Sequence, residues 1–215
     1  MRTLALLSLV LVACGFVTPF QGNGPFVRPP QPQRIHWRHS LALGTPADGR
    51  LVRGVQLPPY GRHYFTWDPV LHRQPDRGWR RWGTDKLVRT VLHVVAAYAA
   101  QHPGAPRVGI GDLSRPHGGY FGPKHATHRN GLDVDVYYPR LDRREEPPTS
   151  VDQIDHRLAQ ALVDLFVHAG VKLIYVGPNT GLKGPPGVVQ ILWNHDNHLH
   201  ARIRWRPGRS LARRA

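Results

Sequence analysis

Cysteine is almost absent from the sequence, since Cys14 is the only one among 215 residues. A single cysteine excludes an intramolecular disulfide, so the folded state must be stabilised by a hydrophobic core and by any metal ion that it binds. It also excludes a metal site built from several thiolates. Any zinc site in this chain must therefore use imidazole and carboxylate ligands.

Acidic residues are scarce: 14 Asp and Glu stand against 29 Lys and Arg, which gives a formal net charge of +15 with histidine neutral. Such a surplus favours an anionic partner, such as nucleic acid, an acidic membrane surface or a cell-wall polymer. A basic composition that only solubilises the surface is an equally good explanation. We expect no nucleic-acid partner, because the sequence has no recognisable nucleic-acid-binding motif and has the features of an export signal.

Long apolar runs are also lacking near the amino terminus, where residues 4–12 are too few to cross a bilayer as a helix. With one positive charge before it, this run is typical of an export signal. The adjoining Leu-Val-Ala-Cys-Gly, residues 11–15, resembles the lipobox of bacterial lipoproteins, in which cleavage precedes the cysteine and the thiol receives a lipid. We therefore expect a signal peptide over 1–13, a lipid anchor on Cys14 and an exported protein of the periplasm or cell envelope. An ordinary secretory signal with a chance cysteine is the alternative.

Proline, glycine and arginine dominate the next segment, which shows no apolar periodicity and includes Arg-Pro-Pro-Gln-Pro at residues 28–32. Proline-rich segments hold an open, semi-rigid form, so residues 14–50 are predicted to be a tether. The length then allows one domain of ordinary size, over residues 51–205. Residues 206–215 are predicted to be a basic tail.

Two helices and several strands are expected within the domain. Thr84 is a suitable cap for a helix that ends at His102-Pro103-Gly104, and Ser150 with Gln153 has the form of a capping box for a second helix that stops at Gly170. Helices separate only some of the strands, which favours an α+β domain with a mostly antiparallel central sheet and flanking helices. The predicted strands are residues 107–113, 132–138, 171–176, 188–193 and 198–205.

Residues 118–138 bring together the side chains that can carry chemistry. A glycine-rich approach leads to His125 and His128, and a short apolar run then presents Asp133 and Asp135. Alternation along a strand puts the two aspartates on one face, and a turn at Asn130-Gly131 lets His128 fold back toward them. A catalytic zinc takes three protein ligands and leaves one position for water, so a further ligand must come from elsewhere.

Asn-His-Asp-Asn-His-Leu-His, residues 194–200, is the obvious donor of that ligand. On an extended chain His198 and His200 face the same way and would both point into one site. The spacing from His128 to Asp135 is weak evidence for a metal when taken alone. It becomes moderate evidence with the downstream His-x-His pair.

These residues resemble the signature of the LAS group of zinc peptidases, named for lysostaphin, D-alanyl-D-alanine metallopeptidases and sonic hedgehog. Within that group the likeness is to the penicillin-insensitive murein endopeptidases, and it covers roughly residues 50–204. The blocks that carry it are Gly54-Val-Gln-Leu-Pro58, Gly111-Asp-Leu-Ser114, Gly118-Gly119, His125-Ala-x-His128-x-x-Gly-Leu-Asp-Val-Asp135, Gly170-Val-x-Leu-Ile174 and His195-x-x-His198-x-His200-x-Arg202. The resemblance implies a fold like that of hedgehog and the D-Ala-D-Ala peptidases.

The resemblance also implies roles for individual residues. His128, Asp135 and His200 match the family's ligands of one zinc ion. His198 matches a histidine that assists the reaction without binding the metal, and His195 matches a further active-site histidine. His125 stands where the family also carries a histidine, and Asp133 is a candidate to orient a ligand imidazole; a purely structural carboxylate is the alternative for Asp133.

The family cleaves peptide crosslinks of peptidoglycan, typically between D-alanine and meso-diaminopimelic acid. The resemblance therefore implies a zinc metallopeptidase that remodels the cell wall from the membrane side. A D,D- or L,D-carboxypeptidase with the same zinc chemistry remains open, and a basic residue such as Arg115 or Arg202 would bind its substrate's free carboxylate. A non-catalytic wall-binding lipoprotein is the other alternative, favoured by the positive charge.

Overall fold

The computed structural model describes residues 34–123 and 125–205, and the elements below lie within these ranges. The predicted signal peptide over 1–13, Cys14 with its expected lipid, and the predicted basic tail over 206–215 lie outside the described residues. Most of the predicted tether, residues 14–33, lies outside them as well. In the described parts of the chain, neither helix is long and apolar enough to cross a membrane.

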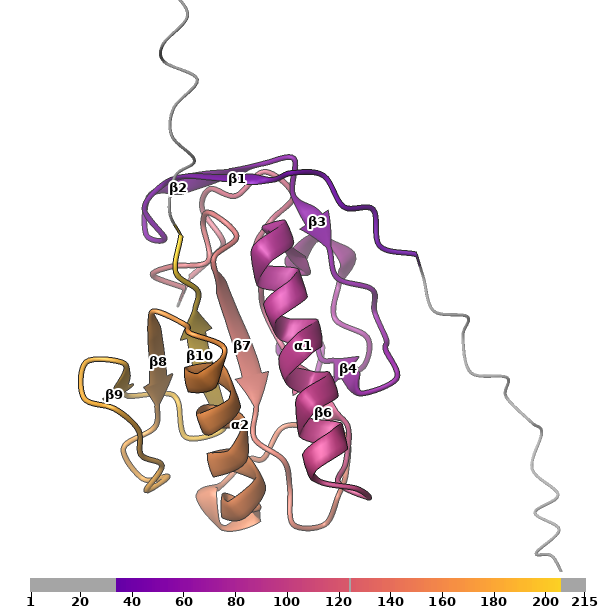
Figure 1. Cartoon of the computed structure of the whole chain (residues 1–215), viewed down its shortest axis with the longest axis vertical. Coiled ribbons are helices and arrows are strands. Elements are labelled where there is room, and N and C mark those ends of the chain that lie inside the picture. Colours follow the sequence, from indigo (N-terminus) through magenta and orange to yellow (C-terminus); the bar gives the residue numbers. More distant parts are fainter. Residues whose placement is uncertain (1–33, 124, 206–215) are drawn as a thin grey trace, which may run out of the picture. The chain divides into compact units, whose positions relative to one another are not determined.

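A six-stranded sheet forms the centre of the domain, with helices α1 and α2 together over one of its faces (Figure 1). The three central strand pairings in this sheet are antiparallel, whereas the two outermost pairings are parallel. The predicted α+β class with a mostly antiparallel sheet is therefore confirmed. In spatial order the strands are β4 (Tyr64–Thr66), β6 (Val108–Ile110), β7 (Asp133–Tyr137), β10 (His198–Arg202), β8 (Leu173–Val176) and β9 (Val189–Ile191).

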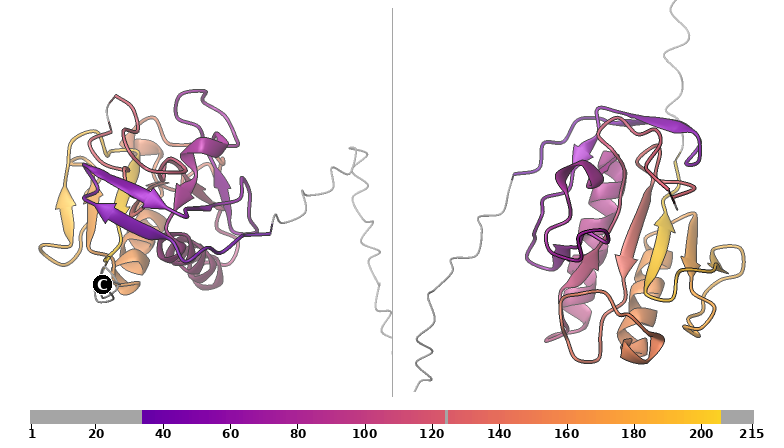
Figure 2. Two further views of the ribbon diagram at one scale, coloured as in Figure 1. Left: turned by 90° about the horizontal axis from the view of Figure 1, so that it is seen from above. Right: turned by 180° about the vertical axis from the view of Figure 1, so that it is seen from behind.

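The two middle strands, β7 and β10, divide their side chains between the faces of the sheet. Val134 and Val136 of β7, with Leu199 and Ala201 of β10, are fully buried in the core that α1 and α2 cover. Because successive side chains alternate, the aspartates of β7 and the histidines of β10 lie on the opposite face. The right-hand view of Figure 2 looks onto that face, with the helices on the far side of the sheet.

Helix α1 (Asp85–Gln101) begins and ends where the sequence predicts. The Thr84 hydroxyl accepts a hydrogen bond from the Leu87 N–H at 3.1 Å, which satisfies one free donor of the first turn. The helix stops at His102, just before Pro103-Gly104. Its buried face consists of residues at helical spacing, namely Leu87, Val88, Val91, Val94, Val95 and Tyr98.

Helix α2 (His156–His168) starts later than the sequence predicts. Ser150 precedes only a single 3-10 turn, η2 (Val151–Gln153), and Ile154 then returns to an extended conformation. Asp155 is the true cap, since its Oδ1 accepts from the Leu158 N–H at 3.0 Å. The predicted capping box is therefore wrong, because Gln153 uses its Oε1 to accept from Arg140 and from the Thr149 N–H instead. Gly170, with φ of 73°, ends the helix as predicted.

Among the described residues, strands are already present before residue 51, where the sequence places the start of the domain. Strand β1 (Leu41–Gly44) pairs antiparallel with β2 (Gly49–Val52), so the last part of the predicted tether is a β-hairpin. A second small sheet joins β3 (Val55–Gln56) to β5 (Trp82–Gly83), and a 3-10 turn, η1 (Gly78–Arg80), precedes β5. Proline-rich composition predicts an extended chain but cannot tell a free segment from one that pairs.

The segment before β1 is attached to the first turn of α1 by Asp85. Its Oδ1 accepts from the Arg38 N–H at 2.9 Å, and its Oδ2 accepts from the N–H and the hydroxyl of Ser40 at 2.6 and 2.9 Å. Partial burial opposes ionisation of Asp85, but these hydrogen bonds prevail and lower its pKa.

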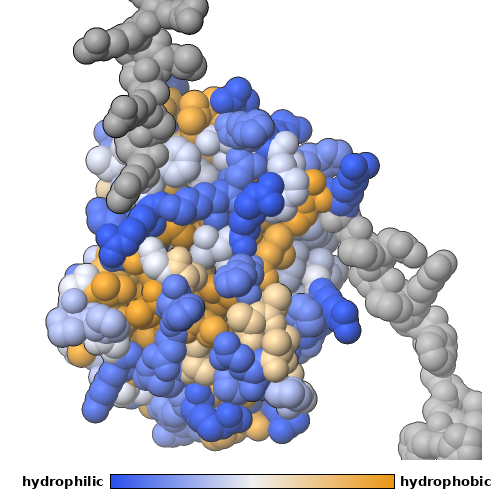
Figure 3. Space-filling view, in the orientation of Figure 1, coloured by the Kyte–Doolittle hydropathy of each residue, from blue (hydrophilic) through white to orange (hydrophobic). Residues whose placement is uncertain are grey.

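On the helix-bearing face of the domain, hydrophobic residues lie in patches between hydrophilic ones (Figure 3).

We expect Asp85→Asn to lower the free energy of unfolding by about 1–2 kcal/mol at neutral pH, since one amide oxygen replaces a carboxylate that accepts three hydrogen bonds. A lowered folded-state pKa gives stability that is present above the unfolded-state value, about 3.9, and is lost as the pH falls through the folded-state pKa. The difference from wild type should therefore shrink in acid. Urea unfolding at several pH values measures it, with exposed Asp152→Asn as the control. A difference that stays constant to pH 2 would contradict the assignment.

Candidate metal centre

His128, Asp135 and His200 meet on the face of the sheet that the helices leave uncovered. Asp135 on β7 and His200 on β10 are direct partners in the strand register. Asp135 Oδ1 lies 2.9 Å from His200 Nδ1 and 3.3 Å from His128 Nε2, and the two ring nitrogens are 3.1 Å apart. All three residues are buried, with at most 8% of their surface exposed. The structure thus brings together the three residues that the resemblance gives as ligands.

The loop before β7 holds His128 over Asp135. His128 has a φ of 66°, its N–H donates to Asp133 Oδ2 at 3.0 Å, and Gly131 follows with a φ of 74°. The Leu113 carbonyl lies 2.6 Å from Nδ1 of the His128 ring and can only accept, so that nitrogen carries the proton. His128 therefore presents the lone pair of Nε2 to the cluster.

The same argument fixes the orientation of His200. Its Nε2 lies 3.2 Å from Asp133 Oδ1, so the Nε2–H donates to that carboxylate and Nδ1 faces the cluster. Arg202 Nε also donates to Asp133 Oδ1, at 2.6 Å. Asp133 thus contacts the backbone of one candidate ligand and the ring of another, as an orienting carboxylate would.

The donor set fits a divalent cation. Nε2 of His128, Nδ1 of His200 and a carboxylate oxygen of Asp135 face one point, and the other nitrogen of each ring already has an acceptor. Burial lowers the pKa of His200, but Asp133 and Asp135 outweigh it and raise the value to about 9. Burial likewise opposes ionisation of Asp135, yet the neighbouring histidines hold its pKa well below the usual range. The cluster therefore stabilises positive charge, either as a proton on His200 or as a metal ion that displaces this proton, and two imidazoles with one carboxylate are a donor set that zinc prefers.

His198 and His195 lie beside the cluster. His198 Nε2 is 3.9 Å from Asp135 Oδ1, while its Nδ1–H donates to Asn197 Oδ1 at 2.7 Å. Burial lowers the pKa of His198 to about 4, so its imidazole is neutral at neutral pH. The His195 ring lies 4.7 Å from the His198 ring, centroid to centroid, and its Nδ1–H donates to the Trp193 carbonyl at 2.8 Å.

His125 contacts an aspartate that sequence reasoning left without a role. His125 Nε2 lies 2.9 Å from Asp112 Oδ2, and both Asp112 oxygens also accept from the buried Arg80 guanidinium. Asp112, His125 and Asp135 could in principle hold an ion together. The ion pair with Arg80 already satisfies Asp112, which favours a structural role for this group.

Two tyrosines near the site were also missed. The Tyr175 ring on β8 lies 5.9 Å from the rings of both His195 and His200, and the Tyr137 ring on β7 lies 6.1 Å from His198. Each tyrosine is the register partner of one histidine of β10. Alternation along residues 132–138 already puts Tyr137 on the face of the two aspartates, although the sequence gave it no role, whereas Tyr175 could be found only from the strand register. Asp112, by contrast, stands in a block that resembles the family.

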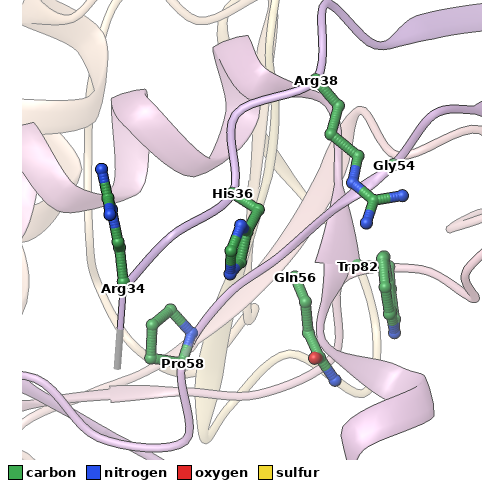
Figure 4. Close-up of a pocket in the computed structure, with 7 residues that line it drawn as sticks. All are labelled: Arg34, His36, Arg38, Gly54, Gln56, Pro58 and Trp82. Carbon is green, nitrogen blue, oxygen red and sulfur yellow. The ribbon is translucent and has the colours of Figure 1, made fainter. Parts of the chain in front are cut away.

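The remaining histidines do not join the cluster. Those on the helices, His93, His156 and His168, are exposed, as expected for surface residues. A cavity of about 370 Å³, drawn in Figure 4, has none of the cluster's residues in its lining. Its lining residues come from the amino-terminal segment, β3 and β5, and are Arg34, His36, Arg38, Gly54, Gln56, Pro58 and Trp82.

Comparison with known proteins shows to which family the sequence is similar. A family sequence model described as penicillin-insensitive murein endopeptidase matches residues 42–168, which is more than half of the chain and includes His128 and Asp135. The matched region begins ahead of residue 51, in β1, and ends before β10. His200, the third residue of the cluster, therefore lies beyond it.

Curated relatives from several Salmonella strains carry the same description. The penicillin-insensitive murein endopeptidases of Salmonella paratyphi B, Salmonella newport and Salmonella enteritidis are each 32% identical to this chain over 96 residues. The aligned part is 45% of this chain and 32% of each relative, so the chain matches about a third of their length. On the extent of the family match, the chain belongs to the penicillin-insensitive murein endopeptidase family.

Proposed function

We propose that this protein is a zinc-dependent peptidase that hydrolyses peptide crosslinks of peptidoglycan, of the kind between D-alanine and meso-diaminopimelate. The observation that carries the proposal is the convergence of His128 Nε2, Asp135 Oδ1 and His200 Nδ1 on one point. Membership of the family, and the description of its Salmonella relatives, support the substrate class.

One zinc ion per chain would be held by His128, Asp135 and His200. When bound, zinc supplies a Lewis acid that polarises a carbonyl and lowers the pKa of water. His198 supplies the proton transfer, because its imidazole is neutral and its Nε2 is free of the bond to Asn197. We infer that Nε2 takes a proton from the attacking water and returns it to the leaving amine.

His195 lies close to both histidines of β10, with its ring centroid 4.7 Å from that of His198 and 6.1 Å from that of His200. Burial lowers the pKa of His195, so this ring is also held in its neutral form. Its Nδ1–H is fixed by the Trp193 carbonyl, which leaves Nε2 as its free polar atom. We infer that His195 hydrogen-bonds the substrate or the developing oxyanion.

A carboxypeptidase that removes a terminal D-alanine would use the same residues. Of the two arginines that could bind a free carboxylate, Arg202 is already paired with Asp133, whereas Arg115 is exposed. Mass spectrometry of digested muropeptides separates the two activities. Monomers released from dimers support the endopeptidase, and loss of alanine alone supports the carboxypeptidase.

Removal of the metal or of one ligand should abolish cleavage. We expect chelator-treated protein, and His128→Ala, to release no monomers from crosslinked muropeptides, while His198→Ala lowers kcat by about 10²- to 10⁴-fold. His156→Ala, at an exposed position on α2, is the matched control and should keep wild-type activity. Full activity after both zinc removal and His128→Ala would reject the proposal.

Asp133→Asn should weaken zinc binding by about 10- to 100-fold, since it removes the carboxylate that orients His200 and the backbone of His128. Competition with a chromophoric chelator measures the affinity, and circular dichroism verifies that the variant is folded. Asp164→Asn, on the exposed face of α2, should bind zinc as the wild type does. Equal affinities for the two variants would show that Asp133 has no orienting role.

We further propose that the protein is exported and attached to a membrane by a lipid on Cys14, on the strength of the Leu-Val-Ala-Cys-Gly stretch. Cys14→Ser should then abolish incorporation of labelled fatty acid and move the protein from the membrane fraction to the soluble fraction. If Cys14→Ser and the wild type show the same fractionation and the same labelling, Cys14 carries no lipid. The alternative of an ordinary secretory signal would then stand. The basic surface would in either case favour contact with an anionic wall polymer.

A further inference from the structure

A small cavity near the metal centre is lined by an aromatic ring and a guanidinium. Its volume is about 280 Å³, and Trp79, Arg115 and Pro116 form its walls. None of these three residues belongs to the metal cluster or to the histidines beside it. The cavity is therefore a separate feature, and the residues proposed for hydrolysis give it no role.

Three arginines lie around the Trp79 ring. Only one of them has no carboxylate partner among the described residues. The guanidinium carbons of Arg77, Arg80 and Arg115 lie 5.2, 4.9 and 4.9 Å from the ring centroid. Arg77 is paired with Asp68, and Arg80 with Asp112 and Asp76. Within residues 34–123 and 125–205, no carboxylate lies within salt-bridge distance of Arg115, which is exposed to solvent.

Two observations show that the cavity is close to the candidate metal centre. Along the chain, Arg115 follows two residues after Leu113, whose carbonyl holds His128 Nδ1. Through space, the Trp79 ring packs at 5.5 Å from Phe121, and Phe121 in turn lies 5.5 Å from the His128 ring. One aromatic side chain thus separates the cavity from a candidate zinc ligand, a gap that a few residues of extended peptide can span.

We propose that this cavity is a specificity subsite in which Arg115 binds a free carboxylate of the peptide substrate, while Trp79 packs on the aliphatic stem that carries it. The inference rests on the proposed function and deepens it, by naming an anionic peptide as the preferred substrate. A guanidinium recognises a carboxylate through two parallel hydrogen bonds, and its stacking on Trp79 holds the fork in place before the substrate arrives. Crosslinked stem peptides that contain diaminopimelate offer such a carboxylate near the scissile bond.

The test compares muropeptide dimers whose diaminopimelate carboxyl groups are free with dimers in which they are amidated. We expect wild-type protein to favour the free form, and Arg115→Gln to lower kcat/KM on it by about 10- to 100-fold, mainly through KM, with little change on the amidated form. Arg115→Lys keeps the charge but not the fork, and should recover part of the loss. Zinc content should equal that of the wild type.

Arg89→Gln is the matched control, because Arg89 is an exposed arginine of α1 that stacks on Trp37 at 3.7 Å. It removes the same charge and the same type of stacking without touching the cavity. An equal loss in both arginine variants, or an equal loss on both substrates, would overturn the subsite while the peptidase function stands. If wild-type protein cleaves neither dimer, the proposed function fails and the subsite fails with it.

Discussion

The antiparallel pairing of β7 with β10 is the constraint on which the rest of the molecule depends. It sets His200 opposite Asp135 and Arg202 opposite Asp133, so that two residues of the metal cluster and their supporting ion pair lie side by side. The alternate residues of the same strands fill the core beneath α1 and α2. A slip of one residue would turn the polar set into the core and the valines outward. Burial of apolar surface therefore enforces the geometry of the site.

Asp133 connects the paired strands to the loop that carries His128. It is fully buried and accepts from the His128 backbone, the His200 ring and the Arg202 guanidinium. Burial of a carboxylate opposes its ionisation, and these donors reverse the effect and lower its pKa. Asp135 is left with its Oδ1 free to face the two imidazoles. The order of the cluster is thus supported by the protein itself, as preorganised metal sites require.

Local patterns in the sequence were sufficient for part of the fold. Thr84 and the apolar stripe after it predict α1 correctly, because capping and helical spacing involve residues only a few positions apart. The same reasoning failed at Ser150, where Gln153 has partners that a capping box does not include. It also gave Asp112 no role, because the contacts of Asp112 with Arg80 and with His125 join residues that are 32 and 13 positions apart. Errors of this kind arise wherever a distant side chain competes for a local hydrogen bond.

The sequence by itself determined the set of candidate donors, since a chain with one cysteine offers histidine and carboxylate rather than thiolates, and the His-x-His pair and Asp-x-Asp pair each face one way on a strand. The family resemblance then selected His128, Asp135 and His200 from that set, but the sequence did not determine which nitrogen of each ring faces the cluster. The tertiary structure decided that His128 offers Nε2 and His200 offers Nδ1, because the Leu113 carbonyl and Asp133 occupy the other nitrogens. It also decided that Arg202 is paired with Asp133, whereas Arg115 has no carboxylate partner among residues 34–123 and 125–205. The reason is physical: these choices depend on contacts between residues far apart in the chain, which strand register and loop closure create and local sequence does not encode.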